Sequence, residues 1–374
     1  MKENISESID ILKQHRKKFD YSASIQMALW NGNQPEKHPL LLTCPLDKVQ
    51  DEKIPSFNTK QTHYDSEKMF LTGLRDIMTV VNGGREAVPS MRANMGCGIF
   101  STLFGLKQQL FDDKMPWVKE HLSKEILAKM SPEDIKIGEE FRAGLDHMSF
   151  FADLLKDTGC MVFPMDLQGV YDTAHIVYED QIFYDMYDDP YFVHHLLELS
   201  CHAICIGMDE CLKIMPDSSI KVAHYNSLVM PRIKGGIKLS EDTSTLLSKS
   251  QIDEFVAPYI KKILNYFGGG YIHYCGYNPH LFEAIMDEPL AYGLNFGNPE
   301  KHDMENILKR CAQNNKIFYG AINKEDGFSN EEYFKKYLNA SKQCNRYMLL
   351  LQFSCSLDER VDVISAWENA SRCL

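Results

Sequence analysis

The sequence predicts an α/β protein, a TIM-type (β/α)8 barrel with a mostly helical or irregular N-terminal extension. From Glu86 to the C-terminus, eight strand-like segments alternate with helix-like segments, which is the pattern of a parallel barrel. Polar residues gather where these strand segments end, whereas a segment body such as residues 347–351 is apolar. With 374 residues, 44% of them hydrophobic and 25% charged, the chain has an ordinary globular composition and can bury a large core.

The first 85 residues differ in pattern from the rest of the chain. Residues 1–19 predict a short charged helix. Residues 20–65 place four prolines among polar residues and are expected to be irregular. A helix from Asp65 to Val81 follows, and two glycines end it. We therefore expect residues 1–85 to form an extension that packs on a barrel built from residues 86–374.

The eight strand-like segments are apolar runs bounded by turn residues or helix starts. The connection between the third and the fourth segment is short, which weakens the prediction that they are two separate strands of the barrel. No internal repeat or low-complexity stretch interrupts the alternation. The segments are Ala87–Met95, Cys160–Gln168, Ile220–Asn226, Ile237–Thr243, Gly270–Cys275, Tyr292–Phe296, Lys316–Ile322 and Arg346–Ser354.

Short signals mark where the intervening helices begin. Asp189-Pro190 and Asn278-Pro279 each place a proline in a first helical turn, where its missing N–H costs nothing. Ser329 with Glu332 is a capping box, and Ser250 with Asp253 is close to one. These signals support helices between the strand segments.

The fifth strand segment carries side chains that are potential metal ligands. The helical pattern of residues 251–267 ends in three glycines, and the strand that follows closes with His273 and Cys275. Successive strand side chains alternate between faces, so these two point to the same side. Cys355 ends the last strand segment, with 79 residues between it and Cys275. One imidazole and two thiols at the carboxyl ends of barrel strands suit zinc, with one ligand position left open. The alternative is a buried histidine with inert core cysteines.

Two carboxylates follow the fourth strand segment, Glu241 and Asp242. Either could act as an acid–base group, or fill the open metal position when no substrate is bound. The remaining polar candidates lie at or near other strand ends, and apolar or aromatic side chains join them in the loops on the same side. They suggest a pocket for a small, partly apolar or aromatic substrate, although each could instead cap a strand or bond a loop. These candidates are Arg92, Asn94, Met95, Asp166, Gln168, Tyr171, Tyr225, Tyr277 and Asn295.

Composition excludes several classes of function. The formal net charge of -12 argues against nucleic-acid binding, which needs clustered lysine and arginine. No apolar run reaches the roughly 18 residues of a membrane span. The polar, acidic start does not resemble a signal peptide. Eleven cysteines without an export signal are expected to be reduced thiols, which indicates a cytoplasmic protein.

Several motifs carry a family resemblance. They include Trp117-Val118-Lys119, Asp166-Leu167-Gln168-Gly169, Tyr187-Asp188-Asp189-Pro190 and Gly269-Gly270-Tyr271-Ile272-His273-Tyr274-Cys275-Gly276, followed by the distant Cys355. In these the chain resembles the uroporphyrinogen decarboxylase superfamily and, within it, the zinc-dependent, corrinoid-linked methyltransferases. The resemblance runs from about Glu86 to the C-terminus and implies the same barrel fold. It also implies that His273, Cys275 and Cys355 bind zinc.

The resemblance separates two branches of that superfamily. The decarboxylases use no metal and carry a Met-Arg-Gln-Ala-Gly-Arg loop, to which residues 91–94 are only superficially similar. Residues 96–105 contain no counterpart of their catalytic aspartate, and Cys355 stands where they have a histidine. We therefore expect the methyltransferase branch, with a metal-free decarboxylase as the alternative. A non-catalytic barrel with a structural zinc fits less well, because structural sites usually have four protein ligands.

The methyltransferase resemblance implies a second substrate, cobalamin. Zinc would polarise a thiol or an ether oxygen, and a methyl group would pass to or from the cobalt of a corrinoid. The corrinoid-binding signature Asp-x-His-x-x-Gly is absent here, so a separate corrinoid protein or free cobalamin is expected as the partner. The direction of transfer stays open, as does the choice among methoxylated aromatics (an O-demethylation), methanol, methylamines, thiols and tetrahydrofolate. A homodimer is one of the oligomeric states left open.

Overall fold

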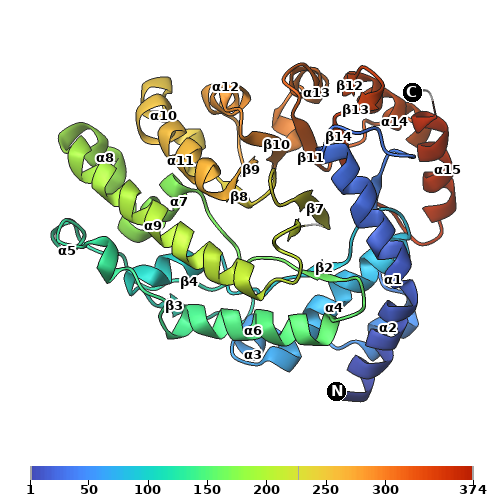
Figure 1. Cartoon of the computed structure of the whole chain (residues 1–374), viewed down its shortest axis with the longest axis horizontal. Helices are drawn as coiled ribbons and strands as arrows, with labels where there is room; N and C mark the ends of the chain where they lie inside the picture. The colour runs from blue at the N-terminus through green and yellow to red at the C-terminus, as the bar shows by residue number, and fades with distance from the viewer. Residues whose placement is uncertain (1, 226, 373–374) are drawn as a thin grey trace.

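The core of the fold is a six-stranded parallel β-sheet ringed by helices (Figure 1). The structure is a computed structural model that describes residues 2–225 and 227–372. The strand order is β1–β14–β11–β10–β9–β8, and every pairing in this sheet is parallel. Its strands are β1 (Leu40–Thr43), β8 (Ile237–Ser240), β9 (Gly270–Tyr274), β10 (Ala291–Phe296), β11 (Ile317–Gly320) and β14 (Leu349–Ser354).

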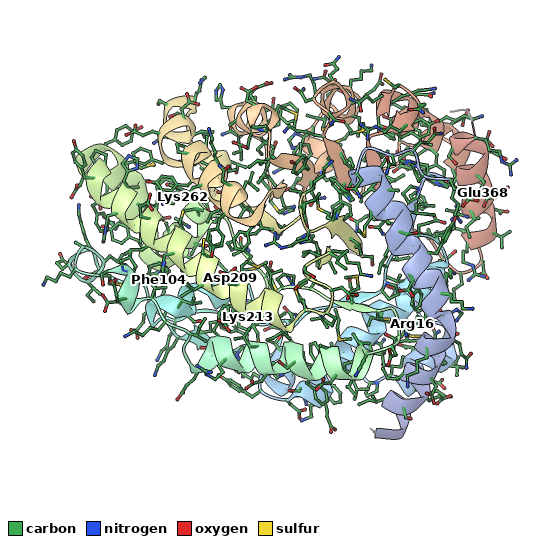
Figure 2. All side chains as sticks on the ribbon, viewed as in Figure 1. Arg16, Phe104, Asp209, Lys213, Lys262 and Glu368 are labelled. Atoms are coloured by element: carbon green, nitrogen blue, oxygen red, sulfur yellow. The ribbon has the colours of Figure 1, made fainter. Side chains whose placement is uncertain are left out.

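Helices cover the outside of this sheet. Figure 2 shows the side chains between them, for example Lys262 of α11, which pairs with Glu198 of α9. The α-helices are α1 (Lys2–Trp30), α2 (Lys48–Lys53), α3 (Thr59–Thr62), α4 (Ser66–Gly83), α5 (Lys124–Leu127), α6 (Glu139–Leu155), α7 (Val170–Tyr178), α8 (Gln181–Asp188), α9 (Pro190–Ile214), α10 (Lys249–Phe255), α11 (Ala257–Phe267), α12 (Pro279–Asp287), α13 (Met304–Gln313), α14 (Asn330–Ala340) and α15 (Arg360–Ser371). Short 3-10 helices are η1 (Ile99–Phe104), η2 (Pro132–Asp134), η3 (Thr243–Leu246) and η4 (Pro299–Lys301).

Side-chain alternation gives each strand of the sheet an outer and an inner row. In β14, Leu349 and Leu351 belong to the large core beneath the helices, whereas Leu350 belongs to a second, inner cluster. In β9, Ile272 faces the outer core and Tyr271 the inner cluster. The same period of two sorts the residues at the strand ends, where the candidate site lies.

A short parallel pair lies between the two edges of the sheet. It consists of β2 (Ser90–Met91) and β5 (Met161–Val162). Beyond β5, the amide of Gly169 donates to the carbonyl of Ser240 in β8 at 2.7 Å. Before β2, the amide of Glu86 donates to the carbonyl of Leu40 in β1 at 3.2 Å. One backbone hydrogen bond from the segment before β2 and one from the segment after β5 therefore reach the two edges of the six-stranded sheet.

One expected barrel strand is wrong. The segment 220–226 was expected to be parallel, but β6 (Lys221–His224) pairs antiparallel with β7 (Leu228–Pro231) in a tight hairpin. Asn226 lies outside the described residues. Leu228 and Met230 of β7 pack in the inner cluster, and Figure 1 draws β7 near the centre of the molecule. The short loop after this segment leaves no room for a crossover helix, and a parallel pair needs one.

A strand of the N-terminal region, β1, instead takes part in the main sheet, and this region is more ordered than expected. Helix α1 spans 29 residues rather than about the first 19, and residues 20–65 contain β1, α2 and α3. β1 pairs in register with β14 from Leu40–Leu351 to Thr43–Ser354. The division into an extension and a barrel domain at residue 86 stays a prediction. Two further antiparallel pairs are formed by β3 (Gln108–Gln109) with β4 (Trp117–Val118) and by β12 (Lys342–Gln343) with β13 (Arg346–Tyr347).

The expected helix starts are confirmed at three places. Asp189 and Asn278 cap α9 and α12 before their prolines, and Ser329 forms a capping box with Glu332. The helical run 251–267 instead divides into α10 and α11. Pro258 falls in the first turn of α11 and cannot donate a helical hydrogen bond, which accounts for the break. The capping box of α10 is formed by Ser248 and Gln251 rather than by Ser250 and Asp253.

No helix among the described residues is long and apolar enough to pass through a lipid bilayer.

Candidate metal centre

Three metal-type side chains meet at the carboxyl ends of β8 and β9. Asp242, His273 and Cys275 each offer a ligand atom, and these atoms all lie within 4.8 Å of one another. The Nε2 atom of His273 is 3.5 Å from the Sγ atom of Cys275 and 3.8 Å from the Oδ1 atom of Asp242. Zinc bonds of about 2.0–2.3 Å in a tetrahedron would separate neighbouring ligand atoms by roughly 3.3–3.8 Å. The donor types and their spacing therefore fit a zinc ion.

A hydrogen-bond chain fixes the tautomer of His273. The amide nitrogen of Asn295 donates to the backbone carbonyl of Tyr319, so its Oδ1 atom is left to accept. That Oδ1 atom lies 2.5 Å from Nδ1 of His273, which must carry the proton. In the neutral ring, Nε2 then presents a lone pair towards Asp242 and Cys275. Metal-binding histidines are typically oriented by such a partner on the other ring nitrogen.

Electrostatics favour a neutral imidazole and a neutral thiol in the absence of metal. Burial, with the charge of Lys238, lowers the pKa of His273, which keeps its imidazole neutral at neutral pH. Burial, with the charge of Asp242, raises the pKa of Cys275 to about 11. A cation bound beside this thiol would favour the thiolate, so metal binding here would release a proton.

Backbone contacts hold Asp242 in place. The amide of Cys275 donates to Oδ1 of Asp242, and the amide of Glu241 donates to the carbonyl of His273 at 2.8 Å. The buried carboxylate of Asp172, on α7, accepts from the amides of Asp242 and Thr243 at 2.7 and 2.8 Å. Burial, with the charge of Asp242, raises the pKa of Asp172 to about 7. The loop after β8 is therefore clamped to both β9 and α7.

The other carboxylate expected to be catalytic, Glu241, points elsewhere. It is fully buried and accepts hydrogen bonds from the amide of Val170 and the hydroxyl of Ser244. Burial and the charge of Asp172 raise its pKa well above the usual value. Its observed contacts tie the start of α7 to the loop after β8, and a catalytic role for Glu241 stays a prediction.

The structure does not bring Cys355 into the group. Its thiol packs against the outer core, continuing the row of Leu349 and Leu351, whereas His273 continues the inner row of Tyr271. The Sγ atom of Cys355 lies 3.7 Å from that of Cys44. Burial, with the hydrogen bond to Cys44, raises the pKa of Cys355 to about 12. Zinc binding by Cys355 therefore stays a prediction that would need the end of β14 to turn inward.

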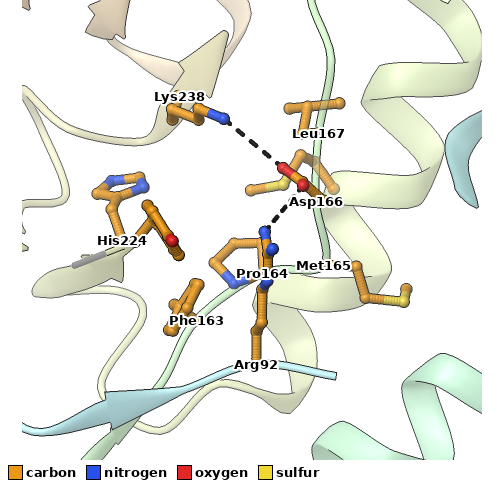
Figure 3. Close-up of a pocket in the computed structure, with 10 residues that line it drawn as sticks. Arg92, Phe163, Pro164, Met165, Asp166, Leu167, His224 and Lys238 are labelled. Carbon is orange, nitrogen blue, oxygen red and sulfur yellow. Dashed lines mark ion pairs between the residues drawn. The ribbon is translucent and has the colours of Figure 1, made fainter. Parts of the chain in front are cut away.

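A shallow hollow opens beside Lys238 and Arg92, and its empty volume of about 310 Å³ includes open solvent (Figure 3). Asp166 forms ion pairs with Arg92 at 3.1 Å and with Lys238 at 3.6 Å. Burial alone would raise the pKa of Asp166, but these two cations hold it below its usual value. The guanidinium of Arg92 lies 5.2 Å from the ring centre of Tyr225 and 5.9 Å from that of Phe163. The hollow thus combines aromatic walls with two cations and one anion.

Lys238 connects this hollow to the metal-type group. Lys238 stands opposite Tyr271 in the β8–β9 register, and Ser240 stands opposite His273. Two residues apart on one strand, Lys238 and Ser240 face the same side. Lys238 was not among the predicted site residues, although a lysine between Ile237 and Leu239 in an apolar strand body is a visible signal in the sequence.

The remaining predicted substrate residues fall into separate places. Tyr225, Arg92 and Asp166 line the hollow, and Asn295 holds His273. Asn94 is exposed and Gln168 is buried, and neither is among the residues that line the hollow. Tyr277 is exposed and packs beside His302.

Two predicted pocket residues lie inside the core. Met95 is fully buried and packs against α6 near Gly144. Tyr171 is fully buried, and its hydroxyl lies 3.7 Å from the sulfur of Met186. Neither lines the hollow in this structure, and their contact with a substrate stays a prediction.

Comparison with protein-family models found no match, and comparison with curated proteins found none. Among solved structures, the chain is similar to a methyltransferase from Methanosarcina mazei, with a TM-score of 0.64 at 10% sequence identity. The match covers 93% of this chain and 98% of that one. At this identity the similarity shows a shared fold, and it extends over nearly the whole length of both chains.

Proposed function

We propose that this chain is a zinc-dependent methyltransferase. It would move a methyl group between a small methyl donor or thiol acceptor and a corrinoid carried on a separate protein. The observation that carries the proposal is the group of Asp242, His273 and Cys275 at the strand ends. The fold shared with a methyltransferase supports the reaction class, and the His-x-Cys…Cys resemblance supports zinc and the corrinoid.

We also propose that the strands complete a (β/α)8 barrel. The six strands of the main sheet and the pair β2–β5 supply eight parallel segments. The hydrogen bonds from Gly169 to Ser240 and from Glu86 to Leu40 link that pair to both sheet edges. In such a barrel the carboxyl ends of the strands form the active face, where His273 and Asp166 lie.

His273, Cys275 and Asp242 would hold the zinc ion, with Cys355 as the further ligand that the family resemblance implies. A zinc ion here would supply a Lewis acid for a thiol or for an ether oxygen. His273 contributes a neutral nitrogen that Asn295 orients, and Cys275 contributes its sulfur after losing a proton. Asp242 is the ligand most easily exchanged for substrate, since carboxylate oxygen is the least soft of the three donors.

The hollow beside this group suits a small molecule with an anionic group. Arg92 and Lys238 share one counter-ion, Asp166, which leaves a formal charge of +1 in the pocket of a chain whose net charge is -12. Phe163 and Tyr225 offer flat aromatic surfaces to the rest of the ligand. A substrate bound there would lie next to Lys238, on the same inner face as His273.

Metal analysis combined with a visible-absorbance methyl-transfer assay tests the proposal. The expected result is about one zinc per chain, lost in the His273→Ala and Cys275→Ala variants, with turnover only when cobalamin or a corrinoid protein is supplied. The Cys344→Ser variant is a matched control, because Cys344 is an exposed thiol outside the group.

Two results would contradict the proposal. Methyl transfer in cobalamin-free buffer would remove the corrinoid from the reaction. Decarboxylation of a carboxylated substrate by metal-free protein would favour the metal-free decarboxylase instead.

A further inference from the structure

Two cysteines far apart in sequence meet at one edge of the main sheet. Cys44 follows β1 and Cys355 follows β14, and the register places Thr43 opposite Ser354 just before them. The amide of Cys355 donates to the carbonyl of Thr43 at 3.2 Å, so the ladder continues to these residues. Their Sγ atoms are 3.7 Å apart, which is van der Waals contact. Residues separated by 311 positions are thus held thiol against thiol.

The backbone at this place suits a disulfide bond. Neighbouring strands lie about 4.8 Å apart, within the Cα separation of about 4.4–6.8 Å that disulfides require. The amide of Cys44 also donates to the carbonyl of Thr79 at 3.0 Å, which anchors β1 to α4. We expect rotation of the two side chains to bring the sulfur atoms, now 3.7 Å apart, together between the two anchored backbones.

The two thiols differ in access. Cys44 is buried, with 1% of its surface exposed, whereas Cys355 is only partly buried. A reagent in solution therefore reaches Cys355 first, and Cys44 is placed to resolve the product from behind. This arrangement of one accessible thiol and one resolving thiol is the geometry of a reversible redox pair.

We propose that Cys44 and Cys355 form a reversible disulfide, with a low-molecular-weight disulfide such as oxidised glutathione as the oxidant. The Cys355 thiol, whose pKa is about 12, first loses its proton. Its thiolate then attacks one sulfur of the oxidant and expels one glutathione thiolate, a step that the small thiolate fraction makes slow at neutral pH. The Cys44 thiolate then attacks the Cys355 sulfur and expels the second. Two protein thiols lose two electrons and two protons, and one oxidised glutathione becomes two reduced glutathione molecules.

The disulfide has a consequence that rests on the proposed function. Cys355 cannot bind zinc while its sulfur is bonded to Cys44, and it stays on the outer face of β14. Oxidation would then restrict the metal ligands to Asp242, His273 and Cys275. Reduction would release Cys355 for the ligand set that the family resemblance implies.

Thiol mapping on metal-free, folded protein tests the disulfide. The protein is treated with oxidised glutathione, quenched in acid, denatured, alkylated and digested for mass spectrometry. We expect a linked peptide pair containing Cys44 and Cys355, and two fewer alkylated thiols per chain, both reversed by dithiothreitol. Cys344→Ser should leave the linked pair unchanged, whereas Cys355→Ser should abolish it. Cys44→Ala and Cys44→Ser should each abolish it as well. Both variants are made because Cys44 is buried and one of the two replacements could destabilise the fold.

Full alkylation of both thiols after oxidation would overturn the proposal, and so would a Cys355–Cys275 linkage. Failure of the proposed function looks different, because the mapping needs neither zinc nor methyl transfer. If Cys355 is not a ligand, reduced Cys355→Ser binds zinc as tightly as the unmodified chain while the Cys44–Cys355 peptide still forms in the parent protein.

Discussion

At the scale of single residues, Asn295 determines which nitrogen of His273 is free to bind a metal ion in the candidate centre. Its two polar atoms have different roles, because the amide nitrogen is used by the carbonyl of Tyr319 and only the oxygen is free for His273. A strand-end asparagine was expected to contact substrate, but here it orients a metal-type ligand. Asn295 is therefore a positioning residue in the proposed site.

We predict that Asn295→Ala weakens zinc binding by about 10–100-fold, the usual effect of losing a partner that orients a histidine ligand. Competition with a zinc-binding dye measures this change. Asn295→Asp keeps an acceptor for the Nδ1 proton and should retain most of the affinity. Asn369→Ala, which removes an amide on the outer helix α15, is the control. Equal zinc affinity in all four proteins would mean that Asn295 does not position His273.

A second residue-scale prediction concerns His38, which is buried beside Trp367. Its Nε2 atom lies 2.6 Å from the carbonyl of Leu349, and its Nδ1 atom has no hydrogen-bond partner among the described residues. Burial lowers the pKa of His38 to about 4. Since the unfolded chain has a histidine pKa of about 6.5, it binds more protons than the folded chain between these two values. Stability therefore falls as the pH drops from about 6.5 to about 4, by roughly 3 kcal/mol for this residue.

The matching measurement is the free energy of unfolding as a function of pH. His38→Gln removes the titrating group, so its stability should fall less steeply between pH 6.5 and 4, whatever its value at pH 7. His280→Gln, at an exposed position, should keep the steep fall. Parallel curves for all three proteins would show that His38 does not contribute to acid unfolding.

The candidate site could be predicted in part from these residues. The period of two in a strand was enough to place His273 and Cys275 on one side, and the strand end was enough to place Asp242 nearby. The period of two could not assign Cys355 to a face of the sheet. The direction of a side chain just beyond a strand end depends on how the backbone turns there. The observed contact of Cys355 with Cys44 depends on β1, whose place in the sheet was not foreseen.

At the scale of elements, the two errors in the expected strands have one cause. Residues 40–43 form a strand of only four residues, with prolines on both sides in the sequence. They were therefore predicted to belong to an irregular extension. Residues 220–226 have a strand-like pattern, and Lys221–His224 do form a strand, but with an antiparallel neighbour. Local pattern predicts that a strand exists; its partner and direction depend on contacts distant in sequence.

The contact between β8 and β9 gives an element-scale prediction. A Cβ atom at Gly270 would lie 2.1 Å from the carbonyl oxygen of Ile237, which is backbone in the neighbouring strand. Gly270→Ala should therefore force the two strands apart and lower the free energy of unfolding by about 2–3 kcal/mol. Gly138→Ala is the control, because its added Cβ atom meets only one backbone oxygen, at 4.0 Å. Chemical denaturation compares the two, and equal stabilities would mean that β8 adapts without loss.

At the scale of the whole molecule, the main apolar core and the candidate metal centre are separated in space. The outer core lies between the sheet and its helices, and it contains most of the buried apolar residues. Asp242, His273 and Cys275 lie at the strand ends, and Cys275 is exposed to solvent. The loop after β8 connects the two regions through the buried carboxylates Glu241 and Asp172.

This separation predicts that metal loss abolishes turnover without unfolding the chain. A chain of this size buries roughly three quarters of its unfolded surface, so one metal ion at the strand ends adds little to its stability. A zinc finger differs, since there the metal supplies most of the folding free energy. His273→Ala and Cys275→Ala should each lower methyl transfer by orders of magnitude. A loss of about 1–2 kcal/mol from such substitutions corresponds to a melting-temperature change of only a few degrees in a large domain.

The test pairs thermal unfolding with the methyl-transfer rate on the same preparations, with and without a chelator. Chelated parent protein should melt close to the metal-loaded form yet show no turnover, and added zinc should restore the rate. Asp172→Ala should behave differently, because it removes a buried acceptor that holds the amides of Asp242 and Thr243 and so affects both stability and rate. If His273→Ala unfolded at room temperature, the metal would be structural. If it kept the full rate, the reaction would take place elsewhere in the molecule, because Nε2 of His273 lies 3.5 Å from Sγ of Cys275 and 3.8 Å from Oδ1 of Asp242 at the centre of the proposed ligand group.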